Sequence, residues 1–308
     1  MTITNLLGIK YPIFQGAMAQ IARHELVSAV SNAGALGILA SGGVSPEELR
    51  KEIQQCKELT DKPFAVNLML MMPNIDKIID VVIEEGVKIV TTGAGTPRKF
   101  IPRLKEAGIK VIPVIPSVKA AVKMEELGCD AVVVEGMEAG GHVGTSTTMA
   151  LLPQVTSAVN IPVIAAGGIA DGRGIAAAYC LGASGVQMGT VFLASEECPV
   201  ADTYKNMILE AVDTSTTLTG EKFGAPVRGI KNELTKKYHE LEERSSTLME
   251  LEELTLGSLR RAVYDGDVEN GSVMAGQIAG LVNEIRPVKN IIEDVIKEAR
   301  EVLKRTEI

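Results

Sequence analysis

Short apolar segments alternate with amphipathic segments along the first two thirds of the chain. The apolar segments are rich in β-branched residues, and such runs predict strands that are buried on both faces. Several follow a glycine, as after Leu127-Gly128, because glycine supplies the left-handed turn that ends a helix. Eight strands are expected, at residues 11–15, 35–40, 64–71, 89–93, 111–115, 131–135, 163–167 and 185–189.

The amphipathic segments between these strands predict helices. They cover residues 23–32, 46–59, 74–85, 98–107, 118–127, 150–159 and 174–181. Strict alternation of strands and helices gives a parallel sheet in an α/β fold, and eight repeats favour a closed (β/α)8 or TIM barrel. An open doubly wound sheet stays possible, since periodicity alone does not show closure.

The alternation lapses after about residue 195. We expect a helix at 202–212, a short strand at 214–219, charged helical sequence over 228–265 and an amphipathic helix at 288–305. Glycines and alanines at helical spacing in 270–281 favour a helix packed closely against the barrel or a cofactor. The predicted organisation is a barrel domain at 1–194 and a helical extension or lid at 195–308. Its final helix would pack back on the barrel.

Composition limits the classes of partner. The 308 residues carry a net charge of −8, which argues against nucleic acid and anionic membranes as partners. Apolar residues make up 46% and aromatic residues 3%, so the core must be aliphatic. No stretch reaches the roughly 18 apolar residues of a membrane-spanning helix. The four cysteines are widely spaced, which predicts reduced thiols in a cytoplasmic protein and no zinc site.

The sixth expected strand ends at Glu135 and leads into a glycine-rich loop that contains His142. Loops after parallel strands carry the chemistry of α/β folds, and glycines let a backbone approach a flat or anionic ligand. A tight turn with a surface histidine is the simpler alternative. His24 and His239 are expected to be solvated, and no two histidines have the spacing of metal ligands.

Two further loops predict a phosphate site. Gly167 and Gly168 follow the seventh strand, and Gly189-Thr190 follows the eighth. Barrels commonly hold a phosphate between these loops on backbone N–H groups and a helix N-terminus.

Amides inside apolar strands pose a separate question. Asn67 and Gln187 are either satisfied core amides or contacts to a ligand. Together with Glu135 they suit a heteroaromatic ring that has donor and acceptor edges. Gly16, Ala17 and Met18 after the first strand form one wall of such a pocket or a plain turn.

A basic cluster stands out in the acidic C-terminal third. It comprises Arg228, Lys231, Lys236 and Lys237. Such a run is usually a hydrated helix face, and the alternative is a docking patch for an acidic partner or the anionic tail of a substrate.

The chain resembles the FMN-dependent enoyl-acyl-carrier-protein reductase II family, within the wider nitronate monooxygenase (2-nitropropane dioxygenase) group. The resemblance runs nearly end to end and is strongest at residues 11–16, 135–142, 165–172 and 272–280. The Glu-Ala-Gly-Gly-His motif that ends at His142 belongs to the whole group. Residues 272–277 and 90–95 are more similar to the reductase branch. Ala17 departs from a glycine that is frequent in these reductases and would narrow the space near the flavin.

The resemblance implies an FMN-binding TIM barrel in which NADH or NADPH reduces trans-2-enoyl thioesters in fatty-acid elongation. The phosphate of FMN would lie near Gly168, Gly189 and Thr190, with the flavin ring beside Ala17, Met18, Asn67, Glu135 and Gln187. The full cofactor-binding set expected is Gly16, Ala17, Met18, Asn67, Glu135, Gly140, Ala166, Gly167, Gly168, Gln187, Gly189, Thr190, Met274, Ala275, Gly276 and Gln277. His142 would be the catalytic residue, either donating a proton or orienting the thioester.

The same resemblance implies an acyl-carrier protein as partner and a homodimer. A nitronate monooxygenase that oxidises alkyl nitronates with oxygen on FMN is the main alternative. A relative of IMP dehydrogenase is disfavoured because the loops after the first, sixth and seventh strands lack a nucleophilic cysteine. A flavin-binding protein without activity is a fourth possibility.

Overall fold

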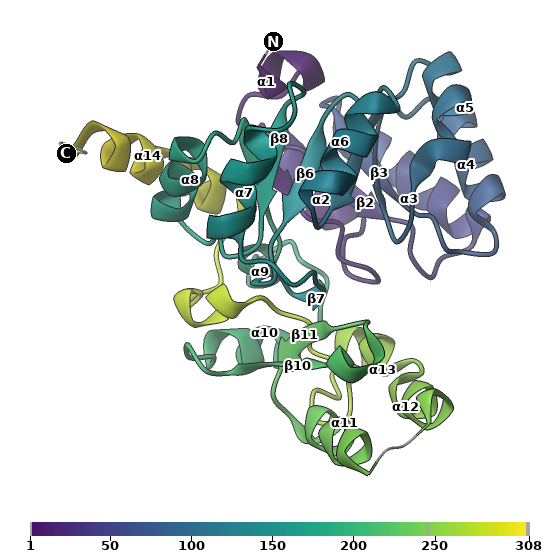
Figure 1. The fold of residues 1–308 in the computed structure, drawn as a ribbon, viewed down its shortest axis with the longest axis vertical. Coiled ribbons are helices and arrows are strands. Elements are labelled where there is room, and N and C mark those ends of the chain that lie inside the picture. The colour runs from purple at the N-terminus through teal and green to yellow at the C-terminus, as the bar shows by residue number, and fades with distance from the viewer. Residues whose placement is uncertain (1, 245–246, 306–308) are drawn as a thin grey trace.

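The computed structural model describes residues 2–244 and 247–305. Its main sheet has eight parallel strands in the order β1-β9-β8-β6-β5-β4-β3-β2 (Figure 1). A parallel bridge between Phe14 and Leu36 joins β1 to β2 and closes the barrel. The strands are β1 (Ile13–Gln15), β2 (Gly37–Ala40), β3 (Phe64–Met69), β4 (Ile89–Gly93), β5 (Lys110–Ile115), β6 (Val132–Glu135), β8 (Val163–Ala166) and β9 (Gly185–Met188). The predicted TIM barrel is confirmed.

Aliphatic side chains fill the barrel. Inward-facing residues from alternate strand positions, such as Ile38, Ile112 and Val133, form one buried cluster. Helix α1 (Ile3–Leu7) contributes Ile3 and Leu7 to the same cluster and so closes the amino-terminal end of the barrel. The other end, at the carboxyl ends of the strands, is the mouth.

Helices surround the barrel in the expected alternation. They are α2 (His24–Asn32), α3 (Pro46–Leu59), α4 (Ile75–Glu84), η1 (Pro97–Lys99), α5 (Ile101–Glu106), α6 (Val118–Glu126), α7 (Thr148–Thr156) and α8 (Gly172–Cys180). Local signals fix their ends. Ser45 and Glu48 form a capping box before α3, with Pro46 at its first position, and the Ser117 side chain accepts from Ala120 N–H at the start of α6.

The chain returns to the barrel through its last helix. Helix α14 (Val288–Arg305) packs against α8 (Figure 1) and also contacts α2. A Cβ atom on Gly172 would lie 2.6 Å from the Val295 carbonyl oxygen and would also collide with the Ala299 backbone nitrogen. The Glu298 carboxylate accepts from the Gly172 N–H at 2.7 Å. Glycine is therefore required where α8 begins, because α14 runs against its backbone.

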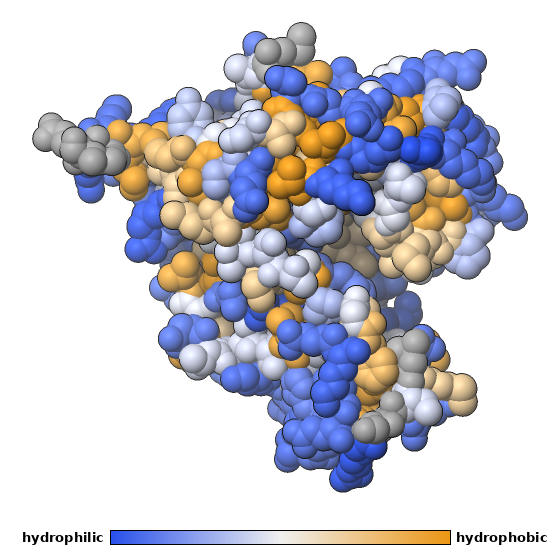
Figure 2. Space-filling model, viewed as in Figure 1, coloured by the Kyte–Doolittle hydropathy of each residue, from blue (hydrophilic) through white to orange (hydrophobic). Residues whose placement is uncertain are grey.

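A second lobe lies below the mouth in Figure 1, and Figure 2 shows a notch between the two on its right-hand side. Besides β7 (Gly141–His142), which comes from a barrel loop, its elements are α9 (Thr190–Leu193), α10 (Asp202–Leu209), β10 (Thr216–Thr219), η2 (Glu221–Phe223), β11 (Val227–Ile230), α11 (Glu233–Glu243), α12 (Leu248–Thr255), α13 (Ser258–Arg260), the π-helical η3 (Arg261–Asp265) and η4 (Gln277–Leu281). Strands β10, β11 and β7 form an antiparallel sheet in that order.

Two expectations for this region are wrong. The segment from residue 228 begins as strand β11 and becomes helical only at Glu233, because residues 227–230 pair with β10, and Val227 and Arg228 also pair with β7. Residues 271–276 form no helix, and only 277–281 form a short 3-10 turn. The glycines there still allow close contact with neighbouring backbone, as expected, but the segment that carries them is not a helix.

We predict that Gly172→Ala destabilises the protein by about 1–3 kcal/mol or more, because the new methyl group has no room beside α14. Urea denaturation measures the change in free energy of unfolding. Ala177→Ser on the exposed face of α8 is the control and should stay within about 0.5 kcal/mol of wild type. Equal stability of the two variants would contradict the close α8–α14 contact.

Candidate active site at the barrel mouth

Polar side chains form the inner layer of the barrel at its mouth. Strand alternation turns Asn67, Thr91, Glu135 and Gln187 inward, above the aliphatic cluster. Strand register places Glu135 opposite Ala166, and Ala166 opposite Gln187. The predicted residues of β3, β6, β8 and β9 therefore meet in one layer.

The sequence left open whether the Asn67 amide is satisfied within the core or contacts a ligand. Its Nδ2 donates to the Thr91 hydroxyl at 2.9 Å, so one donor is satisfied within the barrel. Its carbonyl oxygen has no hydrogen bond within the described residues and stays available. The sequence did not single out Thr91, although its place two residues after the inward-facing Ile89 in β4 is a usable signal.

Glu135 differs from the other carboxylates of the chain. It ends β6, keeps part of its surface exposed at the mouth, and makes no hydrogen bond or ion pair with any described residue. Burial of the carboxyl group among its protein neighbours raises its pKa from the ordinary value of 4.5 to about 7. A carboxyl with these properties can take up a proton near neutral pH or accept a donor from a bound ligand.

His142 lies on a strand rather than on a free loop. It forms β7 with Gly141 and pairs with Val227 of β11, which leaves its side chain exposed. Its neighbour Gly140 packs on the lobe, since a Cβ there would lie 2.6 Å from the Ala275 carbonyl carbon. This glycine allows close packing of the loop on the lobe, and its expected contact with a cofactor stays a prediction.

Arg228 holds the same loop. It lies on β11 opposite Gly141, and its side chain is 4% exposed. Nε donates to the Met137 carbonyl at 3.1 Å, and a terminal nitrogen donates to the Thr216 hydroxyl at 3.2 Å. Burial lowers its pKa, and Glu138 and Glu221 oppose that shift. Arg228 is thus no part of a hydrated face, unlike the exposed Lys231, Lys236 and Lys237.

Free backbone donors lie where the phosphate is expected. Gly167 and Gly168 both have positive φ, at 90° and 76°, and a glycine pair adopts this geometry without strain. The N–H groups of Gly168 and Gly189 donate to no acceptor within the described part of the chain. The Thr190 hydroxyl accepts from the Gly276 N–H at 2.8 Å, which leaves its own proton for another partner.

The N-terminus of α8 is not available there, although α9 begins at Thr190, directly after Gly189. The Asp171 side chain accepts from Gly174 N–H, and Glu298 occupies the Gly172 N–H, so the chain itself fills the start of α8. An anion at this place would rely on loop N–H groups instead.

The remaining predicted residues gather around the same opening. A Cβ on Gly16 would contact the Gln187 side chain at 3.6 Å, and one on Gly189 would lie 3.8 Å from the Met18 sulfur. Ala17 packs on the barrel interior. Segment Met274–Gln277 lies against the β6 loop, since the Gln277 N–H donates to the Glu138 carbonyl at 2.9 Å.

Comparison with known proteins identifies the family. The nitronate monooxygenase family model matches residues 1–78 and 71–298. A probable nitronate monooxygenase of Staphylococcus saprophyticus is 37% identical, with 98% of each chain covered. FabK from Thermotoga maritima is 51% identical, with a TM-score of 0.96 over 99% of this chain and 98% of that one.

The chain belongs to the nitronate monooxygenase family. A further family relative is the (3aS,4S,5R,7aS)-5-hydroxy-7a-methyl-1-oxo-octahydro-1H-indene-4-carboxyl-CoA dehydrogenase of Mycobacterium tuberculosis, 36% identical over 96% of this chain and 95% of that protein. The resemblance inferred from the motifs is confirmed, and the protein is an oxidoreductase of this family.

The other two histidines of this family member are partnered rather than simply solvated. His24 Nδ1 lies 3.0 Å from a Glu52 carboxylate oxygen, and His239 Nε2 lies 3.1 Å from the Thr217 hydroxyl. No group of three or more potential metal ligands occurs among residues 2–244 and 247–305. Within the same residues, no helix combines the length and the apolar character needed to cross a membrane.

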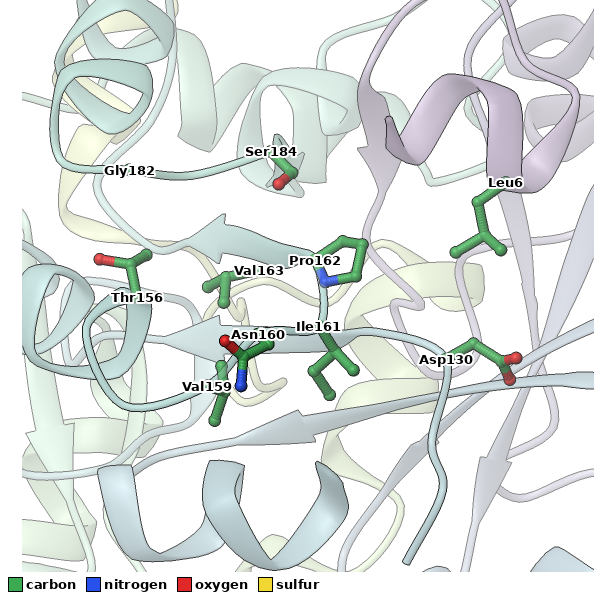
Figure 3. Close-up of a pocket in the computed structure, with 10 residues that line it drawn as sticks. All are labelled: Leu6, Asp130, Thr156, Val159, Asn160, Ile161, Pro162, Val163, Gly182 and Ser184. Atoms are coloured by element: carbon green, nitrogen blue, oxygen red, sulfur yellow. The ribbon is translucent and has the colours of Figure 1, made fainter. Parts of the chain in front are cut away.

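A surface pocket of about 490 Å3 lies at the other end of the barrel (Figure 3). Asp130, Pro162 and Ser184, which line it, precede strands β6, β8 and β9. Asp130 is already paired with Lys105 at 2.5 Å and accepts from Val111 N–H. Its charged group is thus already used within the fold, and the predicted site residues lie at the mouth, which remains the candidate site.

Glu135→Gln should change how stability depends on pH. In the flavin-free protein the raised pKa means that the folded state holds a proton that the unfolded state loses between pH 4.5 and about 7, so wild-type stability falls over this range. The variant lacks this loss and should gain up to about 3 kcal/mol over wild type between pH 4.5 and pH 8.

Urea denaturation at the two pH values tests this expectation. The exposed substitution Glu58→Gln is the control and should follow wild type. Parallel pH profiles for wild type and Glu135→Gln would contradict the account of the buried carboxyl.

Proposed function

We propose that this protein is an FMN-dependent reductase of trans-2-enoyl thioesters, carried by acyl-carrier protein or coenzyme A, with NADH or NADPH as reductant. The observation that carries the proposal is the inward polar layer at the mouth, with an unpartnered Glu135 carboxyl beside loops of free N–H groups. The 51% identity to FabK over the whole chain supports the reductase branch.

The residues at the mouth fit FMN. The free N–H groups of Gly168 and Gly189, with the Thr190 hydroxyl, suit a phosphate. Asn67, Gln187 and Glu135 offer the donors and acceptors that the edge of a flavin ring needs, and Gly16 and Met18 stand beside them. When bound there, FMN would supply hydride transfer between the nicotinamide and the thioester.

The chain's own part in the reaction is to position the thioester and manage a proton. The net reaction adds a hydride to the β-carbon and a proton to the α-carbon, and it oxidises NAD(P)H to NAD(P)+. His142 projects from β7 as an exposed imidazole whose backbone is fixed by β11. It either donates the α-carbon proton or orients the thioester carbonyl.

The second candidate is nitronate oxidation. It is favoured by the family model and by the relative of Staphylococcus saprophyticus. In that case His142 would position or deprotonate the nitro substrate, and oxygen would replace the thioester as oxidant.

The wider setting follows from the resemblance. We propose that the protein is a cytoplasmic homodimer with residues 1–194 as the FMN-binding unit, the remainder covering its mouth, and acyl-carrier protein as its partner.

An anaerobic flavin assay distinguishes the two activities. NADH or NADPH should bleach the yellow purified protein, and crotonyl-CoA should restore the colour at a catalytic rate. Propyl nitronate with oxygen uptake and no need for nicotinamide would select the monooxygenase. A colourless protein that does not bind added FMN would contradict both.

Replacing His142 with alanine should lower kcat for crotonyl-CoA reduction by about 10²–10⁴-fold, as expected when a proton donor is lost. Flavin content and reduction by NADH should stay near wild type, because the imidazole acts on the thioester. His239→Gln on the lobe is the control. Unchanged turnover in His142→Ala would remove this residue from the mechanism.

A further inference from the structure

Tyr264 joins the lobe to the barrel at the rim of the mouth. It belongs to η3, which directly follows α13. Its hydroxyl donates to the Gln20 carbonyl at 2.7 Å, in the loop after β1. The Arg23 guanidinium donates to the same hydroxyl from Nη2 at 3.0 Å and from Nε at 3.3 Å.

A second arginine reaches the same tyrosine. The Arg260 guanidinium carbon lies 5.3 Å from the centre of the Tyr264 ring, within cation–π range. Arg23 and Arg260 thus come together from the barrel and the lobe. Neither has a carboxylate within ion-pair distance among residues 2–244 and 247–305.

Glu48 is an acidic group that interacts electrostatically with both arginines. Its carboxylate accepts from the Ser45 N–H at 2.8 Å in the capping box of α3. Hydrogen bonds to Ser45 lower its pKa most, and the charges of Arg23 and Arg260 lower it further. Because this carboxylate is occupied at the helix start, the two guanidinium groups keep donors for another anion.

The rim carries backbone strain at this place. Gln20 has φ of 65°, a left-handed conformation that is unusual for a residue other than glycine. The hydrogen bond from Tyr264 to its carbonyl helps to hold it. Strain of this kind is retained where the surrounding structure fixes a functional geometry.

We propose that Arg23, Tyr264 and Arg260 form a binding site for a phosphate group of the phosphorylated co-substrate. Guanidinium groups match phosphate oxygens with paired donors, and two of them converge here at the entrance to the mouth. A protein of net charge −8 needs such local positive charge to attract an anionic co-substrate. The link to a co-substrate rests on the proposed function, whereas phosphate binding itself does not.

Two co-substrates share this chemistry. A dinucleotide carries phosphates on its adenosine, and so does coenzyme A. Adenosine 2′,5′-bisphosphate mimics the adenosine end of NADPH, and adenosine 3′,5′-bisphosphate mimics that of coenzyme A. Adenosine serves as the uncharged reference. Titration calorimetry on the FMN-loaded protein should show that one bisphosphate binds more tightly than adenosine, and its identity tells the source.

Arg260→Gln should weaken that binding by about tenfold or more, because a charge-assisted hydrogen bond is lost. Arg244→Gln, an exposed arginine of the same lobe, is the matched control and should bind like wild type. In turnover, Arg260→Gln should raise KM for the co-substrate that carries the phosphate and leave kcat unchanged. The two sources are distinguished by the KM values. A change for NADPH but not NADH indicates the dinucleotide, and a change for crotonyl-CoA but not crotonyl-pantetheine indicates coenzyme A.

The proposal is overturned if neither bisphosphate binds better than adenosine, or if Arg260→Gln leaves both affinities unchanged. Flavin content and NADH-driven reduction of crotonyl thioesters are measured on the same preparations. Failure of those two measurements with intact bisphosphate binding would contradict the proposed function and leave the phosphate site standing.

Discussion

The mouth of this barrel depends on a backbone contact between two segments far apart in the sequence. Gly140 and Gly276 meet so closely that a Cβ on Gly276 would lie 2.8 Å from the Glu138 carbonyl oxygen and 3.3 Å from the Gly140 nitrogen. Hydrogen bonds from the Gly276 N–H to Thr190 and from the Gln277 N–H to Glu138 close the same junction. The loops after β6 and β9 are therefore held as one unit, and β7 with His142 is placed by it. Gly140 of the glycine-rich motif is thus needed for this junction.

The junction also separates two carboxylates that lie three residues apart. Glu138 is fully engaged, since it accepts from the Thr148 N–H at 2.9 Å and from the Thr148 hydroxyl at 3.0 Å. Glu135 faces the mouth, has no hydrogen-bond or ion-pair partner among residues 2–244 and 247–305, and has a raised pKa. Arg228 adds a buried positive charge behind the loop, where it binds the Met137 carbonyl. One carboxylate thus builds the site, and the other remains available for chemistry.

The barrel could be predicted from the sequence because residues within or next to each strand and helix mark that element. Strand 89–93 and helix 46–59 agree with β4 and α3 at both ends, since apolar runs, a capping box and Pro46 mark them. The lobe could not be predicted in this way. Strand β7 has two residues and finds its partner β11 more than eighty residues later, so no local periodicity reveals it. Arg228 likewise reads as one of a run of charges until that pairing buries it. No sequence pattern around Tyr264 indicated its role, because its hydrogen-bond partners Gln20 and Arg23 lie more than 240 residues away in the sequence.

Two of the contacts that attach the lobe to the mouth differ in strength. At β7 it is held by ladder hydrogen bonds, by the buried Arg228 and by the buried hydrogen bond from Gly276 to Thr190. At Tyr264 it is held by hydrogen bonds of one exposed hydroxyl, 41% of the residue being accessible. Since a single such hydrogen bond contributes about 1 kcal/mol, any widening of the entrance would break the Tyr264 contact first and leave His142 in place. A phosphate bound between Arg23 and Arg260 would strengthen this weaker attachment, so that co-substrate binding and closure of the mouth would favour each other.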